Sequence, residues 1–334
     1  MHLQQNISLR PYNTFGIDVP AEFFTELNDI DALEELTELA QQKHIIGGGS
    51  NILLTQPVKG LVIHNKLNGI TLEKENDTHV WLRAQSGEIW HNLVLYAINN
   101  GWGGIENLAL IPGTVGAAPM QNIGAYGVEA RSAIESVTFW YWNERTLLTY
   151  NNRECSFGYR DSIFKHRLKD KVFIASVVFK LSKQPQYNTT YGAIKQELED
   201  MGVNELSVKA IAYAVMNIRR SKLPDPAVIG NAGSFFKNPT IPIAAYQRLH
   251  SRHPTIPSYP VSKTLIKIPA GWLIEQCGWK GYRAGDMGVH TKQALVLVNY
   301  ADAKGSEIWK LSGDILNSVK EQFGIELERE VQVW

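Results

Sequence analysis

The chain lacks the features that mark several broad classes of protein. It has only two cysteines, Cys155 and Cys277, with no metal or redox spacing, so we expect buried free thiols and no disulfide framework. It also lacks an excess of either charge, with 33 basic and 33 acidic residues. No long-range field therefore draws it to a nucleic acid or an anionic membrane. An anionic ligand would have to be held by a few local cations.

Targeting segments, membrane spans and metal patterns are also missing. Residues 1–10 have no apolar core of the length that a secretory signal needs, which favours a cytoplasmic location. The longest uncharged run, residues 107–128, is broken by two prolines and four glycines, which indicates a buried loop system. The nine histidines, His250 and His253 among them, form no ligand pattern, so no metal site is expected.

The first 70 residues predict a small α/β unit. Apolar residues at helical spacing predict a helix over 28–43, with Asn28 or Asp29 available to cap it. Apolar strand pieces follow at 44–46 and 52–54 around a glycine cluster, and a further strand at 61–64. We expect the first domain to end near residue 70.

Beyond residue 70 the sequence pattern changes to one rich in strands. The length of 334 residues leaves room for two or three domains. A second domain is predicted from a hairpin around Asn76-Asp77, a helix stopped by Asn100-Gly101, and β-branched or aromatic strands. Its elements are strands at 70–73, 80–84, 136–142, 146–150 and 172–181 and helices at 88–99, 192–201 and 207–221.

The proline pair in Leu223-Pro224-Asp225-Pro226 is the best linker candidate, and a third domain is expected beyond it. Helices are predicted at 243–250, 271–277 and 306–323, the last ended by Gly324. Residues 325–334 alternate as a strand, with Ile325, Leu327, Val331 and Val333 on the apolar face.

Two clusters of small residues could bring main chain close to a ligand. Gly47-Gly48-Gly49-Ser50-Asn51 offers amide hydrogens and a hydroxyl to phosphate oxygens, and residues 111–127 could let a flat ligand lie against the backbone. A tight turn and a self-packed loop are the alternative explanations. Two such loops in one half of the chain favour a dinucleotide, although neither is a Walker loop or a Rossmann fingerprint.

Three polar segments are open to more than one interpretation. In residues 157–162 Arg160 could pair with Asp161 in a surface turn or bind a substrate carboxylate bidentately. Ser234 lies on a glycine turn before two aromatics, without the histidine and acid of a hydrolase nucleophile. Glu330 belongs to a set of alternating acidic residues for which a solvated face is the simplest explanation.

Taken together, several segments resemble the UDP-N-acetylenolpyruvoylglucosamine reductase family. They occur in the family's order, cover nearly the whole chain and comprise Thr14-Phe15-Gly16-Ile17, 47–51, 111–127, 157–162, 230–239 and 327–331. Residues 187–201, with Tyr191-Gly192, are similar to the loop of the family's longer-chain type. Arg329 stands where some members have proline, and the chain stops soon after Glu330 without the family's usual longer tail.

The resemblance implies an α+β protein. Two domains would form an FAD-binding fold of the p-cresol methylhydroxylase / vanillyl-alcohol oxidase kind, and a third α+β domain would bind substrate. The implied boundaries are 1–70, 71–223 completed by 324–334, and 224–323. The implied reaction is NADPH-dependent reduction of UDP-N-acetylglucosamine enolpyruvate to UDP-N-acetylmuramate through non-covalent FAD, in peptidoglycan precursor synthesis. The protein would be a monomer without nucleic-acid, membrane or metal partners.

The resemblance also carries functional residues to positions of this chain. The catalytic positions are Arg160, Ser234 and Glu330. The FAD-binding positions are Gly47, Gly48, Gly49, Ser50, Asn51, Pro112, Gly113, Thr114, Gly116, Ala117, Gln121, Asn122, Gly124 and Ala125. The substrate-binding positions are Tyr126, Tyr159, Tyr191, Lys222, Asn238, Lys280 and Gln293. The alternatives are another flavin enzyme of this fold, acting on a sugar acid or lactone, and a nucleotide-binding protein that catalyses no reaction.

Overall fold

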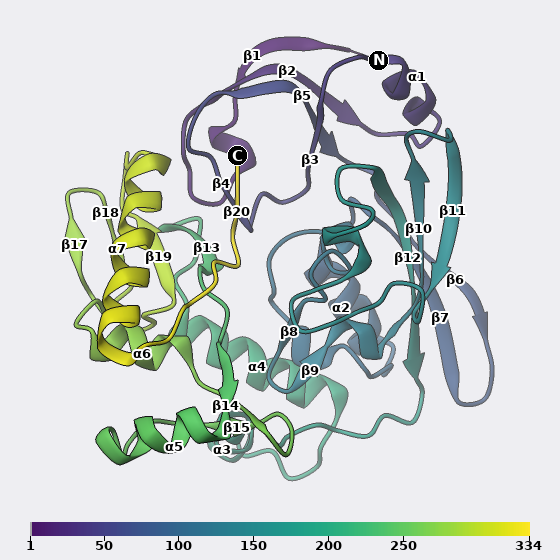
Figure 1. Ribbon diagram of the computed structural model, residues 1–334. Coiled ribbons are helices and arrows are strands. Elements are labelled where there is room, and N and C mark those ends of the chain that lie inside the picture. The colour runs from purple at the N-terminus through teal and green to yellow at the C-terminus, as the bar shows by residue number, and fades with distance from the viewer. Residues whose placement is uncertain (1) are drawn as a thin grey trace. The chain divides into compact units, whose positions relative to one another are not determined.

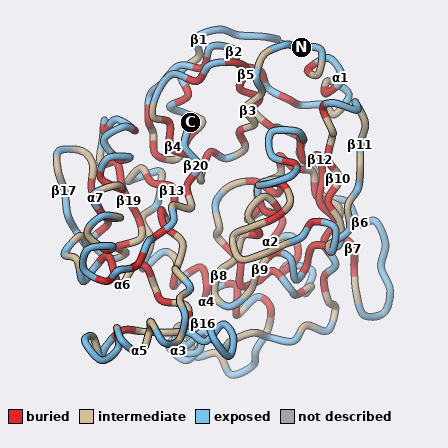
Figure 2. The backbone as a smooth tube through the Cα atoms, viewed as in Figure 1, coloured by how far each residue is buried: buried red, intermediate tan, exposed pale blue. Residues whose placement is uncertain are grey.

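The computed structural model describes residues 2–334, which form two compact units (Figure 1). Unit 1 comprises the residues up to Ile7, Ala21–Gly48 and Lys59–Ser221. Unit 2 comprises Ser8–Pro20, Gly49–Val58 and Lys222–Trp334. Each unit has its own buried strands and helix faces (Figure 2).

The main sheet of unit 1 is antiparallel and has five strands in the order β11-β10-β12-β7-β6. Its central strand β12 is almost entirely buried, as its apolar β-branched sequence demands. The strands are β6 (Ile70–Glu75), β7 (His79–Gln85), β10 (Ile134–Tyr141), β11 (Thr146–Asn151) and β12 (Val172–Ser182).

Helices cover this sheet and complete the larger core of unit 1. Trp90, Leu93, Phe179 and Ile211 are fully buried together, and the Trp90 indole donates to the Leu108 carbonyl at 2.9 Å. The helices are α2 (Trp90–Asn99), α3 (Gly192–Asp200) and α4 (Val208–Lys222). Short pieces fill the loops between them: η2 (Glu106–Leu108), η3 (Val115–Ala117), β8 (Gly124–Ala125), β9 (Val128–Glu129), η4 (Ala130–Ser132) and η5 (Ile163–Lys165).

A smaller sheet, mainly in unit 1, has the strand order β1-β2-β5-β3, with β3 and β5 parallel. Helix α1 (Ala32–Glu38) buries Leu33 and Leu36 in the second core of the unit. The strands are β1 (Gln4–Ser8), β2 (Pro20–Leu27), β3 (Lys43–Ile46) and β5 (Val58–Asn65), and η1 (Arg10–Tyr12) connects β1 and β2.

Unit 2 is built on small sheets. A four-stranded sheet has the order β13-β19-β18-β17, a three-stranded sheet the order β14-β16-β15, and β20 pairs in parallel with β4. The strands are β4 (Ile52–Leu53), β13 (Gly230–Ser234), β14 (Thr240–Pro242), β15 (Tyr259–Pro260), β16 (Leu265–Lys267), β17 (Arg283–Ala284), β18 (Met287–Val289), β19 (Val296–Asn299) and β20 (Gln332–Val333).

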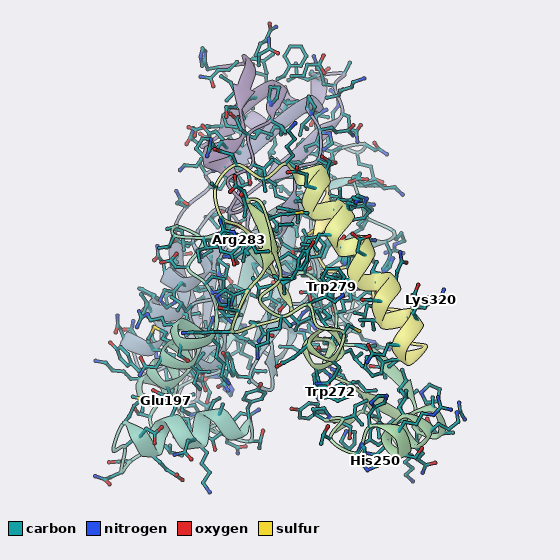
Figure 3. All side chains as sticks on the ribbon, turned by 90° about the vertical axis from the view of Figure 1, so that its left-hand side faces the viewer. Glu197, His250, Trp272, Trp279, Arg283 and Lys320 are labelled. Atoms are coloured by element: carbon teal, nitrogen blue, oxygen red, sulfur yellow. The ribbon has the colours of Figure 1, made fainter. Side chains whose placement is uncertain are left out.

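Three helices complete unit 2: α5 (Ile243–Arg252), α6 (Ala270–Gln276) and α7 (Gly305–Phe323). Helix α7 buries one apolar stripe that includes Ile308, Leu311 and Ile315, and it ends at Gly324, whose φ of 65° is the left-handed value that glycine adopts without strain. Trp279 lies beside this helix in Figure 3 and donates to Ser318 Oγ at 2.6 Å.

Most of the predicted elements are confirmed, including the hairpin of β6 and β7, the strands β10, β11 and β12, and the helices α2 to α7. The helix predicted over 28–43 is wrong in extent, because it spans only Ala32–Glu38. Its predicted cap is also wrong: Asp29 accepts a hydrogen bond from the Asp31 amide, and Asp31 takes the N-cap position without a side-chain cap. Both cysteines are free thiols, but only Cys155 is buried and Cys277 is half-buried.

The C-terminal segment is less regular than its alternating sequence predicts. Only Gln332–Val333 forms a strand, and Val333 is exposed although Ile325, Leu327 and Val331 are buried. Strand β20 pairs in parallel with β4. That residues 324–334 complete the 71–223 domain stays a prediction. The three-domain boundaries stay a prediction. Across residues 2–334, the chain has no helix with the length and apolar composition of a membrane span.

Candidate active site

The two glycine clusters meet within unit 1. A Cβ on Gly47 would overlap the Thr114 hydroxyl, and a Cβ on Gly48 would lie 2.9 Å from Gly113 Cα. A Cβ on Gly116 would lie 2.7 Å from Ser86 Cβ, and the Gly116 amide donates to the Ser86 carbonyl at 2.8 Å. Because there is no room for a side chain at these positions, the two clusters pack closely against each other at Gly47 and Gly48, and Gly116 packs against Ser86.

The segment that carries Arg160 is fastened to the second glycine cluster by side chains. Ser162 Oγ donates to the Met120 carbonyl at 2.6 Å, and Asn122 Nδ2 donates to the Gly158 carbonyl at 2.8 Å. Arg160 Nη2 itself donates to the Gly124 carbonyl at 2.6 Å. These three bonds fix the direction of the guanidinium, which also lies 5.3 Å from the centre of the Tyr159 ring. Asp161 pairs with His166 at 2.7 Å.

Three residues of these loops adopt left-handed backbone conformations that favour glycine. The φ angles are 46° at Asn122, 50° at Tyr126 and 54° at Arg160. Non-glycine residues in this region cost about 1 to 3 kcal/mol each and persist where their surroundings hold them. Asn122 is fully buried. Its Nδ2 donates to the Gly158 carbonyl and to Glu129, and its Oδ1 accepts from the Arg131 amide. Its side chain therefore braces the loop.

A cluster of two tyrosines and an arginine lies beside this loop in unit 1. The Tyr126 and Tyr191 rings pack edge to face with centroids 5.2 Å apart. Arg219, on α4, hydrogen-bonds the Tyr126 side chain and donates through Nε to the Leu110 carbonyl at 3.2 Å. Burial raises the pKa of the Tyr126 phenol, and the positive charge of Arg219 opposes that rise. The phenol therefore stays protonated at neutral pH and can donate a hydrogen bond.

Arg219 is a site residue that the sequence analysis missed. It stands in an Arg-Arg pair near the end of an amphipathic helix, where arginines usually face solvent. Its burial lowers its own pKa, and only the tertiary fold brings it to Tyr126 and Leu110. No local sequence pattern distinguishes it from Arg220.

In unit 2 the structure brings Ser234 and Glu330 together. The Glu330 amide donates to the carbonyl of Phe235, the residue after Ser234, at 2.8 Å, and the Lys237 amide donates to the Glu328 carbonyl at 2.8 Å. Phe236 and Arg329 form the antiparallel bridge between these two bonds. Ser234 is exposed and Glu330 half-buried, so a short ladder of main-chain bonds holds both at an accessible position.

The segment that carries Glu330 is held on its other side as well. The Gln332 amide donates to the Asn51 carbonyl at 3.0 Å, and Asn51 Nδ2 donates to the Glu330 carbonyl at 3.4 Å. The first glycine cluster therefore continues, at Asn51, into the strand beside Glu330. Arg329 anchors the same segment to α7, because its guanidinium lies 3.7 Å from the centre of the Trp309 ring and Nε donates to Ser312 Oγ at 2.7 Å.

The predicted substrate positions of unit 2 fall into separate places. Asn238 Oδ1 accepts from the Ala270 amide at 2.9 Å, and Gln293 Oε1 lies 3.1 Å from a Cβ built on Gly271, so these two meet at the start of α6. Lys280 follows the other end of α6 and pairs with Glu275 at 2.9 Å. Lys222 is the last residue of α4 and is exposed. Arg160, Tyr126, Tyr159 and Tyr191 belong to unit 1.

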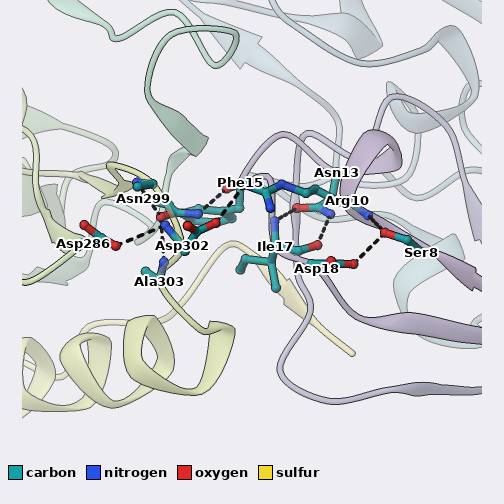
Figure 4. Close-up of polar contacts among 11 residues, drawn as sticks. Ser8, Arg10, Asn13, Phe15, Ile17, Asp18, Asp286, Asn299, Asp302 and Ala303 are labelled. Atoms are coloured by element: carbon teal, nitrogen blue, oxygen red, sulfur yellow. Dashed lines mark hydrogen bonds and ion pairs between the residues drawn. The ribbon is translucent and has the colours of Figure 1, made fainter.

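A cavity of about 420 Å³ in unit 2 is not a candidate site. Its lining includes Asn13 and Asn299. The side-chain amides of both residues already form hydrogen bonds with main-chain groups (Figure 4). Arg10, also in its lining, pairs with Asp302 at 2.9 Å. Within residues 2–334 no three His, Cys, Asp or Glu side chains gather as a metal site would require.

Two known protein families match separate parts of the chain. Residues 21–148 match the family described as FAD binding domain, and residues 225–334 match the family described as UDP-N-acetylenolpyruvoylglucosamine reductase, C-terminal domain. The two matches flank the segment that carries Arg160.

Individual relatives match over the full length. UDP-N-acetylenolpyruvoylglucosamine reductase of Flavobacterium johnsoniae is 47% identical, with 100% of both chains covered. That of Amoebophilus asiaticus is 48% identical, with 100% of this chain and 99% of its own covered. The crystal structure of the Thermus caldophilus reductase has a TM-score of 0.70 at 24% identity and covers 100% of this chain and 99% of that one. The α+β fold prediction is confirmed.

Proposed function

The chain belongs to the UDP-N-acetylenolpyruvoylglucosamine reductase family, and from this premise we propose that Arg160, Ser234 and Glu330 are its catalytic residues. The chain is an FAD-containing oxidoreductase that uses NADPH to reduce UDP-N-acetylglucosamine enolpyruvate to UDP-N-acetylmuramate in peptidoglycan precursor synthesis. The observation that supports the residue assignment best is the main-chain bond of 2.8 Å from Glu330 to Phe235, because it brings two distant polar residues to one place.

We assign FAD to the two glycine clusters, which lie together without side chains between them at Gly47 and Gly48. A pyrophosphate needs close approach of main chain, which glycine-rich loops allow. Bound FAD would supply the chemistry of hydride transfer between NADPH and the enolpyruvyl group. We assign its contacts in unit 1 to Gly47, Gly48, Pro112, Gly113, Thr114, Gly116, Ala117, Gln121, Gly124 and Ala125. In unit 2 we assign Gly49, Ser50 and Asn51. Asn122 contributes through the loop that it braces.

Arg160 receives the negative charge that builds on the substrate carboxylate during reduction. A guanidinium can meet a carboxylate with two parallel hydrogen bonds, and the bond to the Gly124 carbonyl sets its direction in advance. A donor aimed at charge that develops in the transition state contributes about 3 kcal/mol. Arg160 therefore lowers the barrier by binding the reacting form of the substrate more strongly than its ground state.

Ser234 donates the proton that completes the reduction at the adjacent carbon. A hydroxyl is a weak acid, so it can donate a proton only if it is held close to the reacting carbon. The main-chain bonds between residues 235–237 and 328–330 hold the segment next to Ser234 in place. Glu330 assists as a protonated or hydrogen-bonded acid, since an ionised carboxylate would oppose the developing charge.

The substrate's nucleotide and phosphates are held by residues away from the reacting carbon. We assign this role to Tyr126, Tyr159, Tyr191, Lys222, Asn238, Lys280 and Gln293. The edge-to-face pair of Tyr126 and Tyr191 supports the assignment, because it forms an aromatic surface with phenol donors. Arg219 positions Tyr126 within this set.

An anaerobic titration tests the function. The purified holoenzyme should be yellow, should bleach on addition of NADPH, and should regain its colour on addition of UDP-N-acetylglucosamine enolpyruvate. Bleaching without reoxidation by this substrate would contradict the proposed specificity. A protein that cannot be reconstituted with FAD would contradict the reaction as a whole.

We further propose a cytoplasmic monomer that supports cell shape and division. The substrate and NADPH belong to cytoplasmic metabolism, and a cell-wall precursor limits both wall growth and septum formation. Light scattering during size-exclusion chromatography, with and without substrate, measures the oligomeric state directly. A stable dimer would contradict the monomer.

A further inference from the structure

Asn107 is a buried polar residue to which the mechanism above gives no role. Asn107 lies in η2 and is 1% exposed. Its side-chain nitrogen makes two hydrogen bonds. Nδ2 donates to the Tyr126 carbonyl at 3.1 Å and to the Asn188 carbonyl at 2.9 Å. Its Oδ1 atom is buried without a hydrogen-bond partner among residues 2–334. A buried orphan acceptor is unfavourable, so the two donated bonds must offset its cost.

The two carbonyls belong to the two segments that carry the aromatic pair. Tyr126 has a left-handed φ of 50°, which must be held from outside. Asn188 turns the chain toward Tyr191, since its Oδ1 accepts from Thr190 N at 3.2 Å and Thr190 Oγ1 at 2.7 Å. Asn188 Nδ2 also returns a bond of 3.2 Å to the Gly127 carbonyl. Asn107 therefore links the backbones of the two segments whose tyrosine rings, Tyr126 and Tyr191, pack with centroids 5.2 Å apart.

We propose that Asn107 is a positioning residue that sets the geometry of Tyr126 against Tyr191 and thereby the affinity for the nucleotide part of the substrate. This inference rests on the proposed role of the two tyrosines in substrate binding. The side chain of Asn107 acts through the main chain of both segments and reaches the substrate only through them. Its effect belongs to binding, because neither tyrosine is assigned to the reacting carbon.

Aspartate is the sharpest replacement, because it keeps the shape and puts an acceptor against both carbonyls where the donor was. Leucine removes the polar atoms at similar volume. The chain offers a matched control in Asn152, whose Nδ2 donates in the same way to two carbonyls of unit 1, those of Arg131 at 2.8 Å and Ile134 at 2.7 Å. Both of these carbonyls lie outside the segments that carry Tyr126 and Tyr191.

The experiment follows reoxidation of the NADPH-reduced holoenzyme by UDP-N-acetylglucosamine enolpyruvate in an anaerobic stopped-flow instrument. For Asn107→Asp and Asn107→Leu, the half-saturating substrate concentration should rise about tenfold or more, which corresponds to about 1.4 kcal/mol of lost binding. The limiting rate should change less than about threefold. Asn152→Asp should leave both quantities near the wild-type values. A fall in limiting rate at unchanged half-saturation would overturn the proposal.

A double-mutant cycle separates this inference from the function on which it rests. Tyr191→Ala alone should raise the half-saturating substrate concentration. Adding Asn107→Asp to this variant should raise that concentration little further, because the Tyr191 side chain that Asn107 would position is already absent. Fully additive effects would overturn the role of Asn107 while leaving Tyr191 in place. An unchanged half-saturation in Tyr191→Ala would instead overturn the role of Tyr191. If both Asn107 variants lose FAD while the Asn152 variant retains it, Asn107 supports the fold and the proposal is wrong.

Discussion

The segments that carry Arg160 and Glu330 are held in place by different means. Side chains fasten the first: Ser162, Asn122 and Arg160 each bond a main-chain carbonyl across the loops. The second is held chiefly by main-chain bonds, between residues 235–237 and 328–330 and between Gln332 and Asn51, to which the side chains of Asn51 and Arg329 add their own contacts. The first arrangement depends on which residue stands at each position, whereas the second survives most substitutions of its neighbours. The two proposed catalytic positions therefore differ in how far they depend on other side chains.

The largest expected effect comes from Ser234, because the role we propose for its side chain belongs to only one half of the reaction. Ser234→Ala should bleach with NADPH at close to the wild-type rate, while reoxidation by the enolpyruvyl substrate should slow by about 10² to 10⁴, the contribution of a positioned acid. Ser234→Cys should recover part of the activity, because a thiol can still donate a proton. Stopped-flow absorbance measures both half-reactions. Equal slowing of both would make Ser234 a structural or binding residue.

Arg160→Lys tests the side-chain-braced segment directly. We expect turnover with the enolpyruvyl substrate to fall at least about a hundredfold with FAD retained, because a point ammonium cannot reproduce the guanidinium fork. Steady-state kinetics and the flavin spectrum measure the two quantities. Arg167→Lys is the control, since Arg167 is exposed on the following turn. Near-normal turnover of the Arg160 variant would count against the assigned role.

Asn122→Ala asks whether Arg160 depends on its brace. The variant leaves the Gly158 carbonyl and the Arg131 amide without their partner, which should cost about 3 kcal/mol of unfolding free energy. Turnover should fall about tenfold, because the loop under Arg160 loosens. Urea unfolding and steady-state kinetics measure the pair, with Asn152→Ala as the control. Unchanged turnover would show that Arg160 is positioned without its brace.

Arg329→Ala is the corresponding test of the segment that main-chain bonds hold. Losing the contacts with Trp309 and Ser312 should cost about 1 to 2 kcal/mol of stability. Turnover should fall less than about fivefold, because the bonds of residues 235–237 to 328–330 remain. The matched control is Arg283→Ala, since Arg283 stacks on Tyr300 at 4.0 Å in the same unit. A loss as large as that of Arg160→Lys would remove the difference between the two segments.

The smallest expected effect concerns the core behind the Arg160 segment. Burial raises the pKa of the Cys155 thiol to about 12 from its ordinary value of 9.0. The folded protein keeps this proton between those values while the unfolded chain releases it, so this contribution to stability is present below pH 9 and is lost as pH rises toward 12. The melting temperature should fall through that window, and less so in Cys155→Val. Identical profiles would assign the fall to other groups.

Much of the fold could be predicted because its signals are local. Asn100-Gly101 ends α2, Gly324 ends α7, and the alternation around Asn76-Asp77 gives the hairpin of β6 and β7. The helix over 28–43 was predicted too long because Leu39 continues its apolar spacing. In the structure Leu39 turns to ψ 126°, and the chain returns as β3 to pair with β5. A distant pairing partner overrides helical spacing there.

Candidate site residues could be proposed from the sequence only where local motifs mark them. The glycine clusters and the 157–162 and 231–239 segments are visible as sequence, so their residues could be named. The contacts of Arg219 with Leu110 and of Asn107 with Asn188 join residues far apart in the chain. Neither has a local pattern, and Arg219 resembles any arginine near a helix end. Such residues emerge only when the fold brings their partners to them.

The left-handed backbone at Asn122, Tyr126 and Arg160 has a consequence for engineering the enzyme. A glycine would relieve local strain at each of the three, although at Asn122 it would also remove the bonds to the Gly158 carbonyl and the Arg131 amide. A search for heat-resistant variants could therefore accept such a change at Arg160 although it removes the guanidinium. Selection on heat resistance alone would thus accept the loss of the side chain that we assign to the substrate carboxylate. A screen that scores activity and melting temperature together would keep all three residues and seek its gains elsewhere in the chain.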